Sequence, residues 1–356
     1  MAYTTIDDPS AHFQAKVYTG TNSNQSITND GNSDLQPDLI IASFRTAPAY
    51  TNNRALIDSS RGRSKILKPN SDSGEDTTTN AAYDLVSFDT DGFTVGAVNS
   101  TSSLNASGTS NVAWQWKING GTTSSNTSGN VTNTLQVNTT AGISISTFTS
   151  ASSGNTTFGH GLGVTPAMFI SKYRHDYGWW VNHKGLANQS DQYLGLHTTG
   201  DDATVSWGAA PTSTLITLAP AFAGNNLSMV CYAFAEIKGY SKFGKYMGNG
   251  NANGTFIYTG FKPAFFMCKR FDNTGNWLIF DNKRGEFNLN DNYIYLNDNS
   301  SEGTSSSSGV DFLSNGIKMR NTYNDANAAG YSAKYIYMAF AENPFVTSTG
   351  ISTTAR

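Results

Sequence analysis

One alternation of large and small apolar residues occurs three times along the chain. The clearest copy spans residues 335–342 (YIYMAFAE), a second spans 229–236 (MVCYAFAE), and a more divergent copy spans 111–117 (NVAWQWK). With the two-residue period of a β-strand, one face of each copy is bulky and the opposite face is mostly small. The recurrence predicts three related units, each closed by a strand that buries its bulky face. We expect equivalent core positions for Trp114, Phe234 and Phe340.

A nearly continuous apolar run that begins with proline also occurs three times. The runs begin at Pro37, Pro166 and Pro263. Proline at the first position of a strand removes no hydrogen bond from the ladder, and a continuous apolar run indicates burial on both faces. Each run therefore predicts a central strand. A further apolar strand then leads into a turn that contains a base and a glycine, at residues 56–62, 179–185 and 277–285.

The composition agrees with these patterns. Charged residues make up only 14% of the chain, aromatic residues 12%, and glycines number 34, which is typical of turn-rich β-proteins. We predict an all-β fold of tandem β-sandwich units, jelly-roll or lectin-like, that form three internal repeats. The predicted units are residues 1–118, residues 143–238, and residues 239–356 with a C-terminal tail, and each is long enough to bury its own core.

The segment between the first two units has a different composition. Residues 119–142 consist almost entirely of glycine, serine, threonine and asparagine, with isolated apolar residues. Such a segment has few side chains to bury, which predicts an extended linker or a loosely packed ribbon.

Charge and hydropathy argue against several classes of function. The formal net charge is −3 and no run of lysine or arginine occurs, so no nucleic-acid partner is expected. No apolar run approaches the roughly 18 to 20 residues of a membrane-spanning helix, so no membrane insertion is expected. Residues 1–8 are polar and acidic and show no secretory signal. Cys231 and Cys268 lie in predicted strands at non-equivalent places, which indicates two buried free thiols.

The residue types that often carry chemistry do not form a catalytic or metal-binding pattern. Four of the five histidines lie in the second unit, at His160, His175, His183 and His197. Their spacing matches no ligand motif, so neither a metal nor another cofactor is expected. Glu236 and Glu342 take the same place in different units, so solvation of a strand end or pairing with a nearby base explains them better than catalysis. We therefore expect a protein that is not an enzyme.

One aromatic cluster in the second unit is a candidate binding site for carbohydrate or a protein partner. Its residues are Tyr173, His175, Asp176, Tyr177, Trp179 and Trp180. Sugar sites combine an aromatic face with a neighbouring carboxylate or amide, but alternate members of such a cluster also suit a core. Strand alternation places the two tryptophans on opposite faces, so we expect one in the core and the other exposed to a sugar or a neighbouring subunit.

Six motifs spread over nearly the whole chain carry a family resemblance. They are IDDPSAHFQ (6–14), ITNDGNSDLQPD (27–38), AWQWK (113–117), GHGLGV (159–164), GYSKFG (239–244) and AENPF (341–345). In these motifs the chain resembles a family of virion structural proteins of tailed bacteriophages, chiefly marine and cyanobacterial phages. Members of that family are described as tail-fibre-like or simply as structural. The resemblance implies a virion protein that is assembled in the host cytoplasm.

The resemblance and the residues together suggest two roles. The first is a non-enzymatic surface fibre or adhesin that contacts the host envelope or its glycans. The alternative is a capsid decoration or head-fibre protein that stabilises the shell. Either role implies other virion proteins of the capsid or tail as partners, host surface polysaccharide as a ligand of the adhesin, and a homo-oligomer, for which we expect a trimer.

Overall fold

The computed structural model describes residues 3–47, 53–78, 80, 82–98, 104–329 and 333–353. As predicted, the chain is an all-β protein built from antiparallel sheets. Its helices in the described part are single turns: η1 (Pro9–Ala11), α1 (Pro220–Ala223) and α2 (Asn324–Asn327). No helix among the described residues is long and apolar enough to cross a membrane.

Three large sheets share a common order of strands. In each, the strand that contains the alternating motif lies between a strand that precedes it in the chain and the strand of the proline-led run. The first sheet contains β1 (Phe13–Thr19), β9 (Ser110–Trp116), β3 (Leu39–Phe44) and β4 (Ala55–Asp58). The second contains β12 (Ile143–Thr149), β19 (Ser228–Phe234), β14 (Met168–Tyr173), β15 (Trp179–His183), β16 (Gln192–Gly195) and β17 (Ala203–Thr204). The third contains β20 (Ser241–Met247), β28 (Lys334–Pro344), β22 (Phe261–Arg270), β23 (Trp277–Asp281), β24 (Asn292–Tyr295) and β25 (Gly303–Thr304).

A smaller sheet accompanies each large one, and we call the two together a unit. The small sheet of the first unit contains β2 (Gln25–Ile27), β8 (Phe93–Val95) and β7 (Leu85–Phe88). That of the second contains β13 (Thr156–Gly159) and β18 (Leu215–Leu218), and that of the third contains β21 (Phe256–Tyr258), β27 (Gly316–Met319) and β26 (Val310–Leu313). A short hairpin of β5 (Lys65–Ile66) and β6 (Asp76–Thr77) lies beside β4 in the first unit.

The pairing register relates the three large sheets to one another. Trp116 pairs with Leu39, Phe234 with Met168, and Phe340 with Phe265. Each of these partners follows its proline by two residues. The first-unit counterpart of Phe234 and Phe340 is therefore Trp116, and the expected equivalence of Trp114 is wrong by two residues along the strand.

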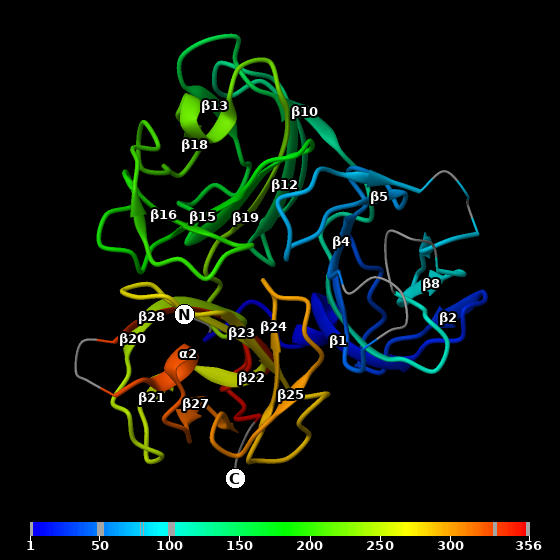
Figure 1. The fold of residues 1–356 in the computed structure, drawn as a ribbon, viewed down its shortest axis with the longest axis vertical. Helices are drawn as coiled ribbons and strands as arrows, with labels where there is room; N and C mark the ends of the chain where they lie inside the picture. Colours follow the sequence, from blue (N-terminus) through cyan, green and yellow to red (C-terminus); the bar gives the residue numbers. More distant parts are fainter. Residues whose placement is uncertain are drawn as a thin grey trace.

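The bulky faces of the three large sheets meet in one shared core. The ring of Phe340 lies 5.6 Å from that of Trp116 and 6.4 Å from that of Phe234, so side chains of all three units touch at one place. Figure 1 shows the units as three lobes around this centre, the first in blue, the second in green and the third in yellow to orange. The bulky face of each closing strand is buried, as expected, and it packs against the other two units.

The small-residue faces pack inside their own units. Cys231 and Ala233 of β19 lie in one cluster with Phe158 of β13 and Ile216 of β18. In the first unit, Ala113 of β9 likewise packs with residues of the small sheet. Each large sheet is therefore covered on both faces, by its own small sheet and by the other units. Cys231 and Cys268 are buried free thiols, as predicted, and burial raises the pKa of Cys268 to about 12.

Residues 119–142 form a paired ribbon, so the alternative of an extended linker is wrong. Strands β10 (Ser124–Asn126) and β11 (Asn133–Asn138) pair with each other, and β11 pairs along its whole length with β12 of the second sheet. Leu135 is buried, and the side chain of Asn133 donates hydrogen bonds to Ser146 Oγ and the Gly159 carbonyl, both at 3.0 Å. Polar side chains with internal partners replace the apolar contacts that the composition lacks.

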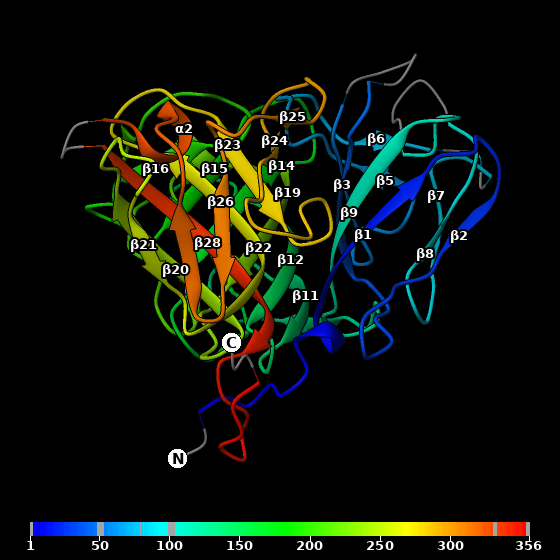
Figure 2. The same cartoon turned by 90° about the horizontal axis from the view of Figure 1, so that it is seen from below.

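The segments near the two ends of the chain lie side by side, as Figure 2 shows from below. The backbone N–H of Ser348 donates to Asp7 Oδ1 at 2.6 Å, and the ring of Tyr3 lies 6.5 Å from that of Phe345. This side of the molecule also carries a cleft, described below.

Candidate functional site

The predicted aromatic cluster lies at the hairpin between β14 and β15. Tyr173 ends β14, Trp179 and Trp180 begin β15, and His175, Asp176 and Tyr177 lie in the turn between them. Pairing places Lys172 opposite Trp179. The turn is short because the two strands are neighbours in the antiparallel sheet, so residues close in sequence remain close in space.

Four of the six predicted residues form a continuous aromatic patch: Tyr173, His175, Tyr177 and Trp180. The ring of Tyr173 lies 4.8 Å from His175, 5.2 Å from Tyr177 and 5.1 Å from Trp180. Tyr177 also lies 5.5 Å from Trp180. Tyr173 and Trp180 are buried beneath, whereas His175 is exposed and Tyr177 is 56% exposed. The accessible part of the patch is therefore the ring of Tyr177 and the imidazole beside it.

The expectation that one tryptophan stays exposed is wrong, because both faces of β15 are covered. Trp179 points toward the shared core, is fully buried, and its indole Nε1 donates to the carbonyls of Lys68 and Ser71 in the first unit at 3.1 and 3.0 Å. Trp180 points the other way, packs on Phe222 of α1, and is 7% exposed. Strand alternation gave the two faces correctly, but not what covers them.

The turn that carries the patch is held by the first unit. Asp176 Oδ1 accepts the backbone N–H of Gly74 at 2.6 Å, and the N–H of Tyr177 donates to the Asp72 carbonyl at 2.8 Å. Lys172 Nζ donates to the Tyr177 carbonyl at 2.7 Å from beneath. Burial lowers the pKa of Lys172 to about 8, although the nearby Asp176 carboxylate opposes the shift. These bonds fix the position of Tyr177 relative to two units at once.

A buried ionic joint lies next to this turn and connects the first unit to the second. Arg61 Nε donates to Asp58 Oδ2 at 2.6 Å, and Arg61 Nη1 donates to Glu75 Oε2 at 2.8 Å. Arg174 of the second unit donates to the other oxygen of Glu75 at 2.8 Å. The hydroxyl of Tyr232, on the closing strand of the second unit, donates to Asp58 Oδ2 at 2.7 Å.

The same arrangement connects the third unit to the first. Arg284 pairs with Asp281 at 2.6 Å and with Glu302 at 3.0 Å, and Glu302 in turn pairs with Arg45 of the first unit at 2.7 Å. Trp114 Nε1, on the closing strand of the first unit, donates to Asp281 Oδ2 at 2.9 Å. Removal of one partner from such a buried pair leaves an unpaired buried charge, which is strongly destabilising. These joints therefore fix the positions of the units relative to one another.

The joint between the second and third units uses a neutral histidine in place of the aspartate. His183 Nδ1 accepts the N–H of Gly185 at 2.9 Å, so Nε2 carries the proton and donates to the Tyr337 carbonyl at 3.1 Å. Burial lowers the pKa of His183 to about 3, which keeps the ring neutral. The joints thus connect each unit to the closing strand of the next and close a ring.

Sequence reasoning missed Glu75 and Glu302, which complete the two ionic joints. The signal available was the repeated acid and base in the turns of Asp58–Arg61 and Asp281–Arg284. The glutamates themselves lie in loops that follow no strand period. The pairing with nearby bases that was expected as one explanation of Glu236 and Glu342 is present, because Glu236 pairs with Lys184 and Lys242, and Glu342 pairs with Lys262.

His160 is buried, with its Nε2 3.2 Å from the Thr212 carbonyl. Within the described part of the chain, no group of three or more histidine, cysteine, aspartate or glutamate residues is placed to hold a metal ion.

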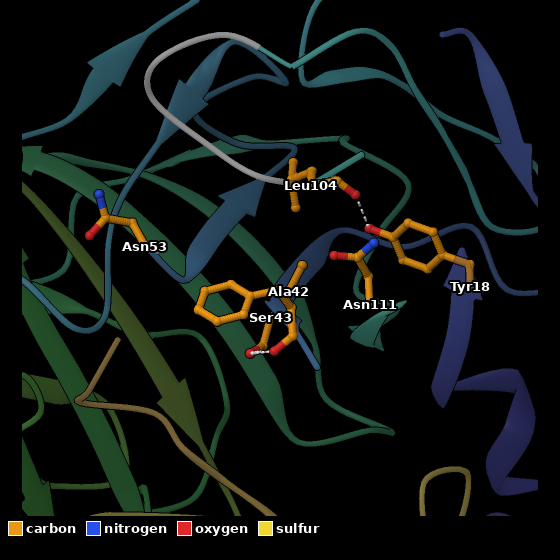
Figure 3. A pocket seen from close by; sticks show the side chains of 7 residues that line it. Tyr18, Ala42, Ser43, Asn53, Leu104 and Asn111 are labelled. Carbon is orange, nitrogen blue, oxygen red and sulfur yellow. Dashed lines mark hydrogen bonds between the residues drawn. The ribbon is translucent and has the colours of Figure 1, made fainter. Parts of the chain in front are cut away.

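Several cavities open on the described surface. One, of about 10 Å³, has room for one water molecule, and Figure 3 shows the Tyr18 hydroxyl at its edge donating to the Leu104 carbonyl at 2.6 Å. A cavity of about 300 Å³ lies between the first and third units, beside Asp30, Lys283 and Glu342. A cavity of about 360 Å³ lies where the N-terminal segment crosses the connection between the second and third units.

Comparison with known proteins matches nearly the whole chain to a family model. The model is described as a domain of unknown function, DUF7483, and it matches residues 8–344. The match begins before β1 and ends at the last residue of β28, so it takes in all three large sheets. No curated protein and no solved structure matches the chain.

Proposed function

This chain belongs to the DUF7483 family of domains of unknown function, and we propose that the protein is a non-enzymatic structural component of a tailed-bacteriophage virion. Membership of the family implies no activity, so the support for this proposal comes from other observations. In this proposal it is a surface fibre or adhesin module that contacts the host envelope or its glycans. The six motifs that resemble phage virion proteins support the virion assignment.

The observation that carries the adhesin role is the exposed ring of Tyr177 on a fixed turn. Tyr177 is 56% exposed, and Asp176 and the backbone hold its turn to the first unit. An aromatic ring that is positioned before the ligand arrives loses little conformational freedom on binding. The apolar face of a pyranose would stack on Tyr177, with His175 beside it as a hydrogen-bonding group.

A single patch of this kind binds weakly, so the adhesin role requires several copies. Linking sites in one particle raises the apparent affinity by orders of magnitude without any new contact. The expected homo-oligomer, a trimer, would supply such copies, and other virion proteins of the capsid or tail would anchor it.

The test is adsorption of phage particles that carry Tyr177→Ala. The matched control is Phe287→Ala, because Phe287 is also an exposed aromatic residue, at 81%, and lies in the third unit away from the patch. We expect the adsorption rate to fall for Tyr177→Ala and to stay unchanged for Phe287→Ala. Loss of a stacking contact weakens each site by roughly two- to tenfold, and multivalency amplifies this difference. Equal adsorption of the two variants would refute the adhesin role.

The alternative role, capsid decoration or a head fibre, is favoured by the ring of joints. The shared core and the two ionic joints fix the three units to one another. A protein that stabilises a shell requires such a fixed arrangement. In that case Tyr177→Ala particles would adsorb normally, and particles without the protein would lose resistance to heat or low salt.

A further inference from the structure

The cavity of about 360 Å³ has the anatomy of a saccharide-binding cleft. It lies beside the segment that joins the second and third units, and the N-terminal segment forms one wall. Its lining includes Tyr3, Glu236, Lys238, Lys242, Tyr258 and Gly260. A cavity of this size falls at the lower end of the range of small-molecule sites, which suits one or two sugar rings.

One wall of the cleft presents an aromatic ring. Strand β21 is the edge of its sheet, and its alternation buries Ile257 while Phe256 and Tyr258 point outward. Tyr258 is 55% exposed and lines the cavity. The neighbouring ring of Tyr3 is covered by Lys238, whose Nζ lies 4.6 Å from the ring centroid. Tyr258 is therefore the better stacking surface of the two.

The hydroxyl ends of both tyrosines converge at Gly260. The Tyr3 hydroxyl donates to the Gly260 carbonyl at 2.7 Å, which fixes that ring. Gly260 has φ of +81°, and a Cβ built there would lie 2.8 Å from the Tyr3 hydroxyl and 3.5 Å from that of Tyr258. The absence of a side chain at this position thus keeps the floor of the cleft open.

The lining of the cleft also includes a carboxylate held between two lysines. Glu236 pairs with Lys184 and, at 2.6 Å, with Lys242, and its side chain remains 27% exposed. Burial opposes ionisation of Glu236, but hydrogen bonds from Lys184 and Lys242 keep its pKa below the ordinary value. A paired carboxylate and ammonium accept from and donate to hydroxyl groups without requiring a charged ligand. This chemistry suits a neutral pyranose.

We propose that this cleft binds a neutral sugar residue of a surface glycan, with its C–H face on Tyr258 and its hydroxyls on Glu236 and Lys242. The site deepens the proposed adhesin function and rests on it, because it adds a second glycan contact on another part of the molecule. It also gives the ligand a chemical class, a neutral rather than an acidic sugar.

The test uses the purified full chain and saturation-transfer NMR with methyl glycosides of glucose, galactose, mannose and N-acetylglucosamine as probes, and glucuronic acid as the acidic comparison. Tyr258→Ala is compared with Phe256→Ala, since both residues lie on the outward face of β21 and only Tyr258 lines the cleft. We expect transfer to the ring protons of at least one neutral glycoside, unchanged in Phe256→Ala and weakened roughly tenfold in Tyr258→Ala.

Failure of this site is distinguishable from failure of the adhesin role. Transfer that is equal in Tyr258→Ala and the unmodified chain, or absent for every neutral probe, overturns the proposed site. If adsorption of particles still depends on Tyr177 in that case, the adhesin role stands without the cleft. Loss of the signal in both Tyr258→Ala and Phe256→Ala would mean that β21 acts through its fold, and would also overturn the assignment to Tyr258.

Discussion

Replacement of Phe340 by alanine tests whether the three units share one core. Phe340 is fully buried, and its ring has six aromatic neighbours within 6.4 Å. They are Phe13 and Trp116 of the first unit, Phe234 of the second unit, and Tyr240, Phe243 and Phe265 of the third unit. The substitution therefore removes one side chain and opens a void that borders all three sheets.

The expected loss of stability is about 4 kcal/mol. Phenylalanine-to-alanine substitutions in cores cost roughly 3 to 5 kcal/mol, because transfer energy and a cavity penalty add. Complete burial and six ring contacts place Phe340 in the body of that range. A loss of this size is a large part of the 5 to 15 kcal/mol that is usual for the free energy of unfolding of a domain.

The assay is native-state hydrogen exchange read separately in each unit. Amides in β9, β19 and β28 report on the first, second and third sheets. If the core is shared and unfolding is cooperative, Phe340→Ala lowers the free energy of opening by the same amount in all three strands. Phe287→Ala is the control, because this residue is 81% exposed and its loss should change stability by less than about 0.5 kcal/mol.

A loss of protection confined to one unit would contradict a shared core. If β28 alone lost protection while β9 and β19 kept theirs, the units would unfold independently. The ring contacts between units would then contribute little to stability, whatever their geometry.

Two further predictions concern the joints. Asp281→Ala leaves Arg284 buried without its nearest carboxylate, and it should lower the free energy of unfolding, measured with denaturant, by roughly 3 to 5 kcal/mol. Asp311→Ala removes a partner from a more exposed pair and should lower it by less than about 1 kcal/mol. Equal losses would contradict the role of burial. The pKa of His183 is depressed to about 3 in the folded chain, whereas an unfolded histidine titrates near pH 6.5. The contribution of neutral His183 to the free energy of unfolding is therefore complete above about pH 6.5 and is lost as pH falls toward 3. His183→Gln should therefore flatten the fall in stability over that pH window, and a profile that keeps its slope would show that other groups cause it.

The sequence predicted the elements well because their signals are local. The alternation in residues 229–236 assigned Tyr232 and Phe234 to one face and Cys231 and Ala233 to the other, and the structure places them so. The proline-led runs predicted the central strands for the same reason. The two-residue period of a strand, however, does not indicate which part of the molecule packs against each face of that strand.

The parts that could not be predicted depend on contacts between distant segments. Trp179 is covered by the carbonyls of Lys68 and Ser71, more than 100 residues away in the chain, so its burial left no trace in the local pattern. Glu75 and Glu302 lie in loops with no periodicity, although each completes a buried pair. The identity of the accessible ring, Tyr177 rather than a tryptophan, follows from the same long-range cover.

Imaging of the intact particle tests the central claim most directly. A cryo-electron microscopy map of the virion, with the three-lobed unit of Figure 1 fitted into its density, would locate the protein. The adhesin proposal predicts this density at an exposed position on a tail fibre or tail tip, with Tyr177 turned away from the particle. Density bound across the capsid lattice, with Tyr177 turned toward the shell, would contradict it.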